Sequence, residues 1–228
     1  VGRFEAIVEI YNFSNYFLEP KKDKISRDLK FSQDYKVLQT HGFRLQNSSG
    51  RVGALCWSKR RKILFCASAE NQIFAFKFSG RSPRLVALLS GPKAGACRLR
   101  WSPLGSSLAI GGRDGNVYLF KESDIVASAK SATHREHEKI DRKELKFGQK
   151  AVVKEVVMAV EWCPWKSNLL AVGTASGKLQ LFDLRQKSKR LEKSAEVQSG
   201  RGAVTGIVFL PQHREMLSSH GCVKDKNR

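Results

Sequence analysis

The chain has 228 residues, and 41 lysines and arginines against 21 acidic residues give it a formal net charge of +20. Hydrophobic residues make up 41% and aromatic residues 9%, which excludes a chain that is disordered throughout. No apolar run of about 18 residues occurs, which excludes a membrane-spanning helix, and no secretory leader is visible. The charge would attract nucleic acid, an anionic membrane or an acidic protein, and does not choose between them. The chain begins at Val1, so we expect it to be part of a longer protein.

The five cysteines favour a reducing compartment. Their number is odd, no two form a C-x-x-C pair, and four of them lie inside apolar, strand-like runs. We therefore expect small buried thiols, whereas a disulfide scaffold or a zinc ribbon is poorly supported. The residues are Cys56, Cys66, Cys97, Cys163 and Cys222.

In chain order, apolar alternation is interrupted by two charged segments. Residues 1–13 are predicted to be the last strand of a preceding unit, and residues 14–50 a basic insertion or connector. Residues 51–126 are predicted to form two repeat units. Residues 127–152 form a charged insertion, and residues 153–228 one further unit plus a partial one. Loops or a short exposed helix suit both insertions.

The units are recognised by aligning them on tryptophan. The segment from Trp57 to Phe76 aligns without a gap with the segment from Trp101 to Phe120, and the segment from Trp162 needs one extra residue. In each unit an apolar alternation, a polar turn, an apolar run, a small turn and a second alternation follow one another, which predicts strand, turn, strand, turn, strand. A more variable fourth strand fits between units, as in residues 84–90.

This layout, at about 44 residues per unit, predicts an all-β fold of the WD-repeat β-propeller type. A seven-bladed ring needs about 300 residues, so the chain supplies about four of its blades. Trp57, Trp101 and Trp162 are predicted to be core residues, and truncating any of them to alanine should cost about 3–5 kcal/mol.

Motifs of enzyme chemistry are missing from the sequence. It contains no G-x-S-x-G, H-E-x-x-H or G-x-x-x-x-G-K-[ST] pattern, so neither an enzyme nor a cofactor or metal site is predicted. The glycines of residues 111–116 lie between two strands, which favours a turn with positive φ over a phosphate loop. The basic run at residues 58–62 is interpreted as a solvated hairpin tip, with a nuclear-import or nucleic-acid patch as the alternative. Exposed aromatic residues would strengthen the alternative, but Trp57 and Phe65 are predicted to point inward.

Four segments resemble the Fizzy and Fizzy-related family, the WD-repeat activators of the anaphase-promoting complex. They are RVGALCW at 51–57, GGRDGNVYLF at 111–120, EWCPWKSNLLA at 161–171 and EMLSSHG at 215–221, in the family's own order. The W-C-P-W-x-S-N-x-L-A string is the most specific of them. The resemblance implies a substrate receptor that holds short degrons, the D box and the KEN box, on a propeller and presents them to a ubiquitin ligase.

The resemblance also implies where a degron would bind. The asparagine of the family's KEN pocket falls at Arg113, with Asp114 retained; its Gly-Gly-Thr turn falls at Gly173 and Thr174; and its glutamine falls at Ala203. Two of the three elements depart from the family pattern, so a divergent motif preference is expected. The blades that form the D-box groove, the C box and the terminal Ile-Arg tail are not found in this sequence.

The function predicted from the sequence is therefore a substrate-recognition activator, not an enzyme, that needs no cofactor. Its expected partners are subunits of the anaphase-promoting complex and degron-bearing substrates, in the nucleus and cytoplasm, with the chain monomeric inside a large assembly and not bound to membrane. The alternative is a basic WD-repeat scaffold that binds RNA or a ribonucleoprotein, which would show steep salt dependence. A phosphoinositide-binding propeller is disfavoured because its F-R-R-G motif is missing.

Overall fold

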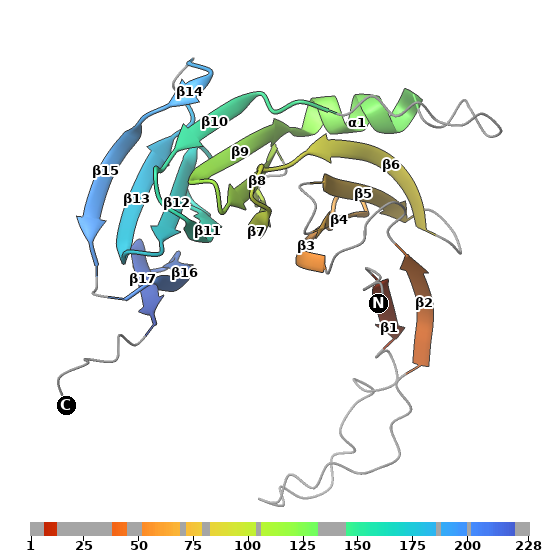
Figure 1. The fold of residues 1–228 in the computed structure, drawn as a ribbon, viewed down its shortest axis with the longest axis horizontal. Helices are drawn as coiled ribbons and strands as arrows, with labels where there is room; N and C mark the ends of the chain where they lie inside the picture. Colours follow the sequence, from red (N-terminus) through yellow and green to blue (C-terminus); the bar gives the residue numbers. More distant parts are fainter. Residues whose placement is uncertain are drawn as a thin grey trace, which may run out of the picture.

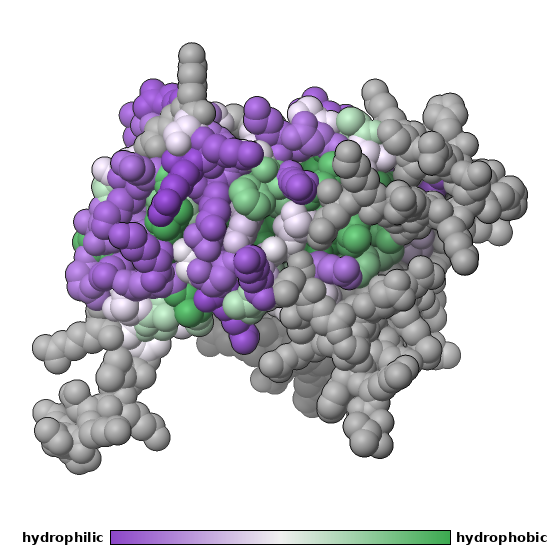
Figure 2. All heavy atoms as spheres, turned by 45° about the horizontal axis from the view of Figure 1, so that its top comes forward, coloured by the Kyte–Doolittle hydropathy of each residue, from purple (hydrophilic) through white to green (hydrophobic). Residues whose placement is uncertain are grey.

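The computed structural model is an open arc of β-sheets, with the β1–β2 pair at one end and the β16–β17 pair at the other (Figure 1). Among the described residues, no helix is both long and apolar enough to cross a lipid bilayer. Figure 2 shows hydrophilic side chains over much of the described surface at the left of the view. The structure describes residues 7–12, 38–44, 52–68, 72–78, 83–103, 106–131, 145–185, 188–199 and 202–221.

The first four-stranded sheet follows the predicted pattern of strands and turns. Its strands pair antiparallel in sequence order, and β4 is buried along nearly its whole length because it is apolar on both faces. The strands are β3 (Val52–Ser58), β4 (Ile63–Ser68), β5 (Gln72–Phe78) and β6 (Pro83–Ser90).

The second sheet gains a fifth strand from the next repeat unit. Strand β14 pairs in parallel with β10, with Lys150 opposite Arg190 and Ala151 opposite Leu191. Leu191 is fully buried, so β14 fastens the third unit onto the outer edge of the second. The strands are β7 (Ala96–Trp101), β8 (Ser107–Gly112), β9 (Asn116–Lys121), β10 (Gln149–Val152) and β14 (Arg190–Leu191).

The third four-stranded sheet repeats the antiparallel order, and two-stranded sheets stand at both ends of the arc. The third sheet consists of β11 (Val157–Trp162), β12 (Leu169–Thr174), β13 (Lys178–Asp183) and β15 (Lys193–Gln198). The terminal sheets are β1 (Ile7–Asn12) with β2 (Leu38–Arg44), and β16 (Val204–Leu210) with β17 (Glu215–His220).

The sheets pack face to face through apolar side chains. One core cluster joins the first and second full sheets and includes Phe65, Leu108 and Ile110, all fully buried. A second joins the second and third full sheets and includes Trp162 and Leu170. The inner strands line a hollow of about 670 Å³ at the centre of the arc. The predicted all-β propeller fold is confirmed, with successive blades arranged around a central hollow.

Both insertions differ from their predicted boundaries. Strand β2 lies inside the predicted connector 14–50 and pairs with β1. Helix α1 (Glu122–Ser131) begins before the predicted insertion 127–152, and β10 ends inside it. The helix is held by the fully buried Ile125. An anchored helix therefore leads into the insertion, and the insertion ends in β10, which pairs with β9 at the outer side of the second sheet.

The prediction that all three tryptophans are core residues is wrong for Trp57. Trp162 is 2% exposed, but Trp57 is 46% exposed and Trp101 is half-buried. Trp101 stacks on Phe65 of the preceding sheet at 5.2 Å, and the Trp162 indole N–H donates to the carbonyl of Arg100 at 3.1 Å. The sheet that precedes β3 in the chain has two described strands, β1 and β2. Phe65 does point inward, as predicted.

The cysteines are free thiols wherever the structure describes them. Cys66 and Cys163 are buried, whereas Cys56 and Cys97 are half-buried and so are less enclosed than predicted. Burial raises the pKa of the Cys66 thiol to about 12, which keeps it protonated and unreactive at neutral pH. Cys222 lies outside the described residues.

Candidate functional site

The turn between β8 and β9 carries two of the predicted site residues. Arg113 is exposed, and its backbone N–H donates to the carbonyl of Gly95 at 3.1 Å. Asp114 faces the turn, and its Oδ2 accepts from the Tyr118 hydroxyl at 2.6 Å and from the backbone N–H of Lys93 at 3.2 Å. Burial first, and then the hydrogen bond to Asp114, raise the pKa of Tyr118 above its usual value. Asp114 is therefore engaged in holding the turn in shape.

Gly115 closes this turn and joins it to the next loop. Its φ of 76° lies in the left-handed region, as predicted for a turn glycine. Its carbonyl accepts the backbone N–H groups of both Val153 and Lys154 at 3.0 Å. A Cβ added to Gly115 would lie 3.1 Å from the backbone of Lys154 and Glu155, so a side chain there would be strained both by φ and by this close approach.

The loop at residues 153–156 in turn meets the β12–β13 turn, because the Ala175 N–H donates to the Val156 carbonyl at 3.0 Å. Three segments thus lie side by side along one edge of the propeller. We call this surface the rim, and it consists of residues 113–116, 153–156 and 174–178.

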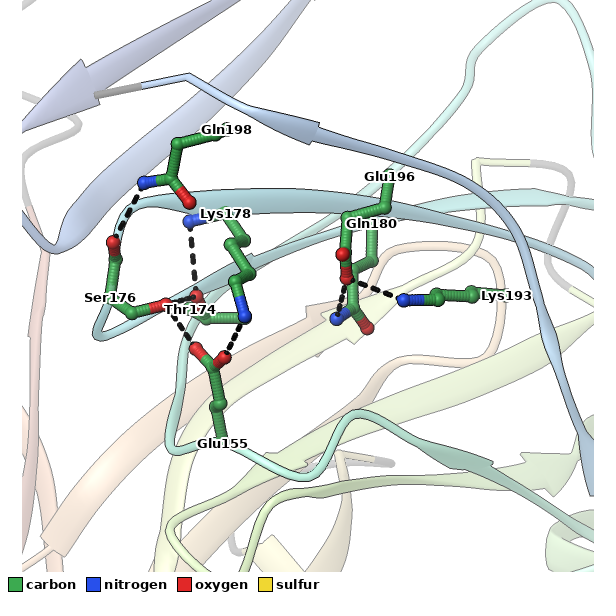
Figure 3. Close-up of polar contacts among 8 residues, drawn as sticks. All are labelled: Glu155, Thr174, Ser176, Lys178, Gln180, Lys193, Glu196 and Gln198. Atoms are coloured by element: carbon green, nitrogen blue, oxygen red, sulfur yellow. Dashed lines mark hydrogen bonds and ion pairs between the residues drawn. The ribbon is translucent and has the colours of Figure 1, made fainter. Parts of the chain in front are cut away.

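Glu155 links the 153–156 loop of the rim to the 174–178 turn (Figure 3). Its Oε1 lies 2.6 Å from the Lys178 ammonium, and its Oε2 accepts a hydrogen bond from the Ser176 hydroxyl. The hydrogen bond from Lys178, and then that from Ser176, lower the pKa of Glu155 to about 2. The Thr174 hydroxyl accepts the backbone N–H of Lys178 at 3.1 Å and shapes the same turn. Glu155 is thus ionised at any physiological pH and its charge is balanced.

A second polar cluster lies beside it on β13 and β15 (Figure 3). The Gln180 amide donates to Glu196 at 2.6 Å, and Lys193 lies 2.9 Å from the same carboxylate oxygen. Gln198 donates to the Ser176 carbonyl at 3.0 Å and ties β15 to the turn. The β12–β13 turn is therefore held by Glu155 on one side and by Gln198 on the other.

The structure places the predicted residues along this edge but gives them unequal roles. Arg113 presents a side chain to solvent, whereas Gly173 and Thr174 are buried. A Cβ on Gly173 would lie 2.5 Å from the Val204 side chain, so Gly173 permits the next sheet to pack. Ala203 is half-buried, and its carbonyl accepts the Gly221 N–H at 2.8 Å. Gly173, Thr174 and Ala203 thus serve packing and backbone geometry.

Sequence reasoning missed Lys154, Glu155, Ser176 and Lys178. Glu155 and Lys178 are 23 residues apart on different elements, so no local spacing connects them. The one available signal was their neighbourhood: Ser176 and Lys178 flank the turn that follows Thr174. Lys154 and Glu155 lie beside none of the predicted turns, so the sequence carried no signal for them.

The rim combines exposed cations with an exposed apolar side chain. The part of the chain that the structure describes holds no group of three His, Cys, Asp or Glu residues able to bind a metal ion. Arg113 and Lys154 are exposed cations on adjoining loops, and Val156 is 37% exposed beside them. Such a surface can bind an extended segment that carries an acidic side chain and a small apolar one.

Comparison with known proteins agrees with this architecture. The profile of the family described as WD domain, G-beta repeat, matches residues 83–121, from β6 through β9. "Cell division cycle 20.1, cofactor of APC complex" from Arabidopsis thaliana is 30% identical over 77% of this chain and 34% of its own length. "WD repeat-containing protein slp1" from Schizosaccharomyces pombe is 28% identical over 75% of this chain and 30% of its own length. "Anaphase-promoting complex subunit cdc20" from Dictyostelium discoideum is 27% identical over 78% of this chain and 31% of its own length.

Two solved structures support the fold. A chain in "Crystal Structure of Mitotic Checkpoint Complex" superposes with a TM-score of 0.59 at 24% identity, covering 81% of this chain and 48% of that one. Saccharomyces cerevisiae Sqt1 superposes with a TM-score of 0.58 at 12% identity, covering 72% of this chain and 39% of its own. The chain spans about a third of the length of the curated relatives it matches. The repeat pattern, the propeller sheets and these relatives together identify the chain as a divergent member of the Cdc20/Fizzy family of WD-repeat proteins.

Proposed function

We propose that the chain belongs to a substrate-recognition activator of the anaphase-promoting complex, and that its rim binds short degron segments. The family relationship supports the first part, because relatives carry the names of cofactors or subunits of that complex. The rim supports the second, and the observation that carries it is the pair of exposed cations, Arg113 and Lys154, on loops joined through Gly115. The protein acts in this proposal as an adaptor without catalysis of its own.

The rim would recognise a degron through the charges of its exposed cations, which stand on loops whose backbone is already fixed. An acidic side chain of the degron pairs with Arg113 and Lys154, whose loops are already fixed by hydrogen bonds, so little ordering entropy opposes binding. Glu155 is neutralised by Lys178 and does not repel that acidic group. The family's asparagine and glutamine are replaced here by Arg113 and Ala203, so the preferred degron is more acidic than a KEN box.

A fluorescence anisotropy titration tests the rim directly. The probe is a labelled 12-residue peptide containing Lys-Glu-Asn, compared with the same peptide carrying three alanines. Arg113→Ala should weaken binding about fivefold, as expected for loss of an exposed ion pair of about 1 kcal/mol. Asp114→Ala should also weaken binding, because Asp114 holds the turn through Tyr118 and Lys93.

The matched control is Arg185→Ala, which removes one exposed arginine at the opposite end of β13 from the rim. It should leave peptide affinity unchanged. Equal loss in Arg113→Ala and Arg185→Ala would assign binding to net charge and reject the rim. The complex itself is tested by capture: tagged full-length protein should retain the anaphase-promoting complex from nuclear and cytoplasmic extracts, and failure beside a known activator would reject the assignment.

A further inference from the structure

Two short segments each tie one blade to the outer edge of the blade before it. Both come just before the fourth strand of their own sheet, and both run parallel to the outer strand of the preceding sheet, as Figure 1 shows for β14 beside β10. We call them straps: the first strap consists of residues 145–148 and the second of residues 188–191. Because an outer strand leaves one backbone edge unpaired, a strap gives that edge hydrogen-bond partners that the blade itself lacks.

The first strap lies against β6. The Leu145 N–H donates to the Leu88 carbonyl at 2.8 Å, and the Leu145 carbonyl accepts the Ser90 N–H at 3.0 Å. The Leu145 side chain is half-buried and packs against the core cluster between the first and second full sheets. One leucine and two backbone hydrogen bonds thus hold this strap against the preceding blade.

The second strap lies against β10 and is anchored more deeply. The Lys150 N–H donates to the Lys189 carbonyl at 2.9 Å, and the Gln149 side-chain amide donates to the Ser188 carbonyl at 3.2 Å. Leu191 is fully buried in the core cluster between the second and third full sheets. A two-residue strand is too short to persist through backbone pairing alone, so the buried leucine is what fixes the strap.

The second strap lies directly behind the rim, because β10 runs into the loop that carries Lys154. Val153, the first residue after β10, is buried in the same core cluster as Leu191, and its N–H donates to the Gly115 carbonyl at 3.0 Å. The loop is thus held to the third sheet at the rim by the ion pair of Glu155 and behind the rim by Leu191. A partly exposed ion pair is a weak attachment, whereas a buried leucine is a strong one.

We propose that Leu191 is a positioning residue for the rim. It is fully buried and touches no bound segment, but it keeps β10 against the third sheet and so fixes the loop that presents Lys154. The proposal rests on the proposed function of the rim and adds the contact that preorganises it. With the strap loosened, the loop would have to be ordered when a peptide binds, and this ordering would oppose binding.

Hydrogen exchange and peptide binding test the proposal on the full 228-residue chain. In Leu191→Ala the backbone amides of residues 149–156 should exchange on the order of tenfold faster than in the parent chain, because local opening becomes easier. Affinity for the labelled Lys-Glu-Asn peptide should fall about threefold, because the loop is no longer preorganised. Leu191→Met nearly conserves the buried volume and should restore both values.

Leu108→Ala is the matched control, since Leu108 is also a fully buried leucine but lies at the end of β8 that is far from the rim. It should leave the exchange of residues 149–156 and the peptide affinity at the values of the parent chain. Equal changes in Leu108→Ala and Leu191→Ala would show that both quantities follow global stability, and would overturn the proposal. Faster exchange in Leu191→Ala with unchanged peptide affinity would overturn it as well.

Two further comparisons keep the outcomes distinct. Leu191→Val removes less volume and takes the place of Leu191→Ala if circular dichroism shows that the alanine variant does not fold. If the parent chain fails to bind the peptide, the degron proposal fails, whereas the exchange of residues 149–156 still decides whether Leu191 holds the Lys154 loop.

Discussion

The first and third full sheets are built from the same repeat, but equivalent side chains in the two sheets lie in different environments. Trp57 and Trp162 hold the same position in the repeat, yet one is 46% and the other 2% exposed. The β3–β4 hairpin of the first sheet carries four cations, of which Arg61 pairs with Glu122, and Lys178 of the third sheet is paired with Glu155. The comparison teaches that the repeat sets the place of a side chain in the sheet, and the elements packed against that place decide whether it is buried or paired.

The largest expected effect is on stability at the two tryptophans. Trp162→Ala should lower the free energy of unfolding by about 3–5 kcal/mol, because it leaves a cavity in the core and deprives the Arg100 carbonyl of its donor. Trp57→Ala should cost about 1 kcal/mol or less, because much of that side chain already contacts water. Urea unfolding followed by circular dichroism measures both. Equal losses of unfolding free energy in the two variants would contradict the difference in burial between Trp57 and Trp162.

A smaller effect is expected where the third full sheet meets the terminal β16–β17 sheet. Gly173→Ala should cost about 1–3 kcal/mol, because its Cβ would lie 2.5 Å from the Val204 side chain. Adding Val204→Ala should restore part of the loss by making room. Gly148→Ala is the control, since the nearest atom to its Cβ is 3.8 Å away. Thermal unfolding of the three variants tests the packing, and a control as unstable as Gly173→Ala would contradict it.

The smallest effect concerns pH. The pKa of Glu155 is lowered to about 2, so its ion pair stabilises the folded chain fully above its ordinary pKa of 4.5 and progressively less as pH falls toward 2. The stability difference between the parent chain and Glu155→Gln should therefore shrink over that interval. Lys178→Met should likewise reduce the dependence of folding stability on pH, because it removes the ion-pair partner of Glu155. Urea midpoints between pH 2 and 6 measure this, and a constant difference would exclude the ion pair as its source.

The sequence predicted most of the fold because each strand carries its own signal. Val117 and Leu119 pack into one core cluster and Tyr118 and Phe120 into the other, as successive side chains of a strand do, and Gly115 marks the turn before them. The exposure of Trp57 could not be predicted in the same way, because it depends on the surface of a neighbouring sheet. The parallel pairing of β14 with β10 depends likewise on a contact between residues about 40 positions apart.

The candidate site was predicted only in part, for a related reason. Arg113 was identified from a local motif, and its side chain is exposed to solvent. Gly173 and Thr174 belong to the same kind of motif, but Gly173 makes room for Val204 and the Thr174 hydroxyl accepts the Lys178 N–H. Glu155 has no motif at all, since its role arises from a partner on another loop.

A charge-reversal experiment tests most directly whether the rim reads a degron. Arg113→Glu should weaken binding of a peptide with Glu at the central position of Lys-Glu-Asn by more than the roughly fivefold loss expected for Arg113→Ala. It should bind the peptide with Lys at that position more tightly than the parent chain does. Fluorescence anisotropy of both peptides against both proteins gives the four affinities. A crossed preference would establish that Arg113 faces the central residue of the bound segment. The same preference in both proteins would contradict the account.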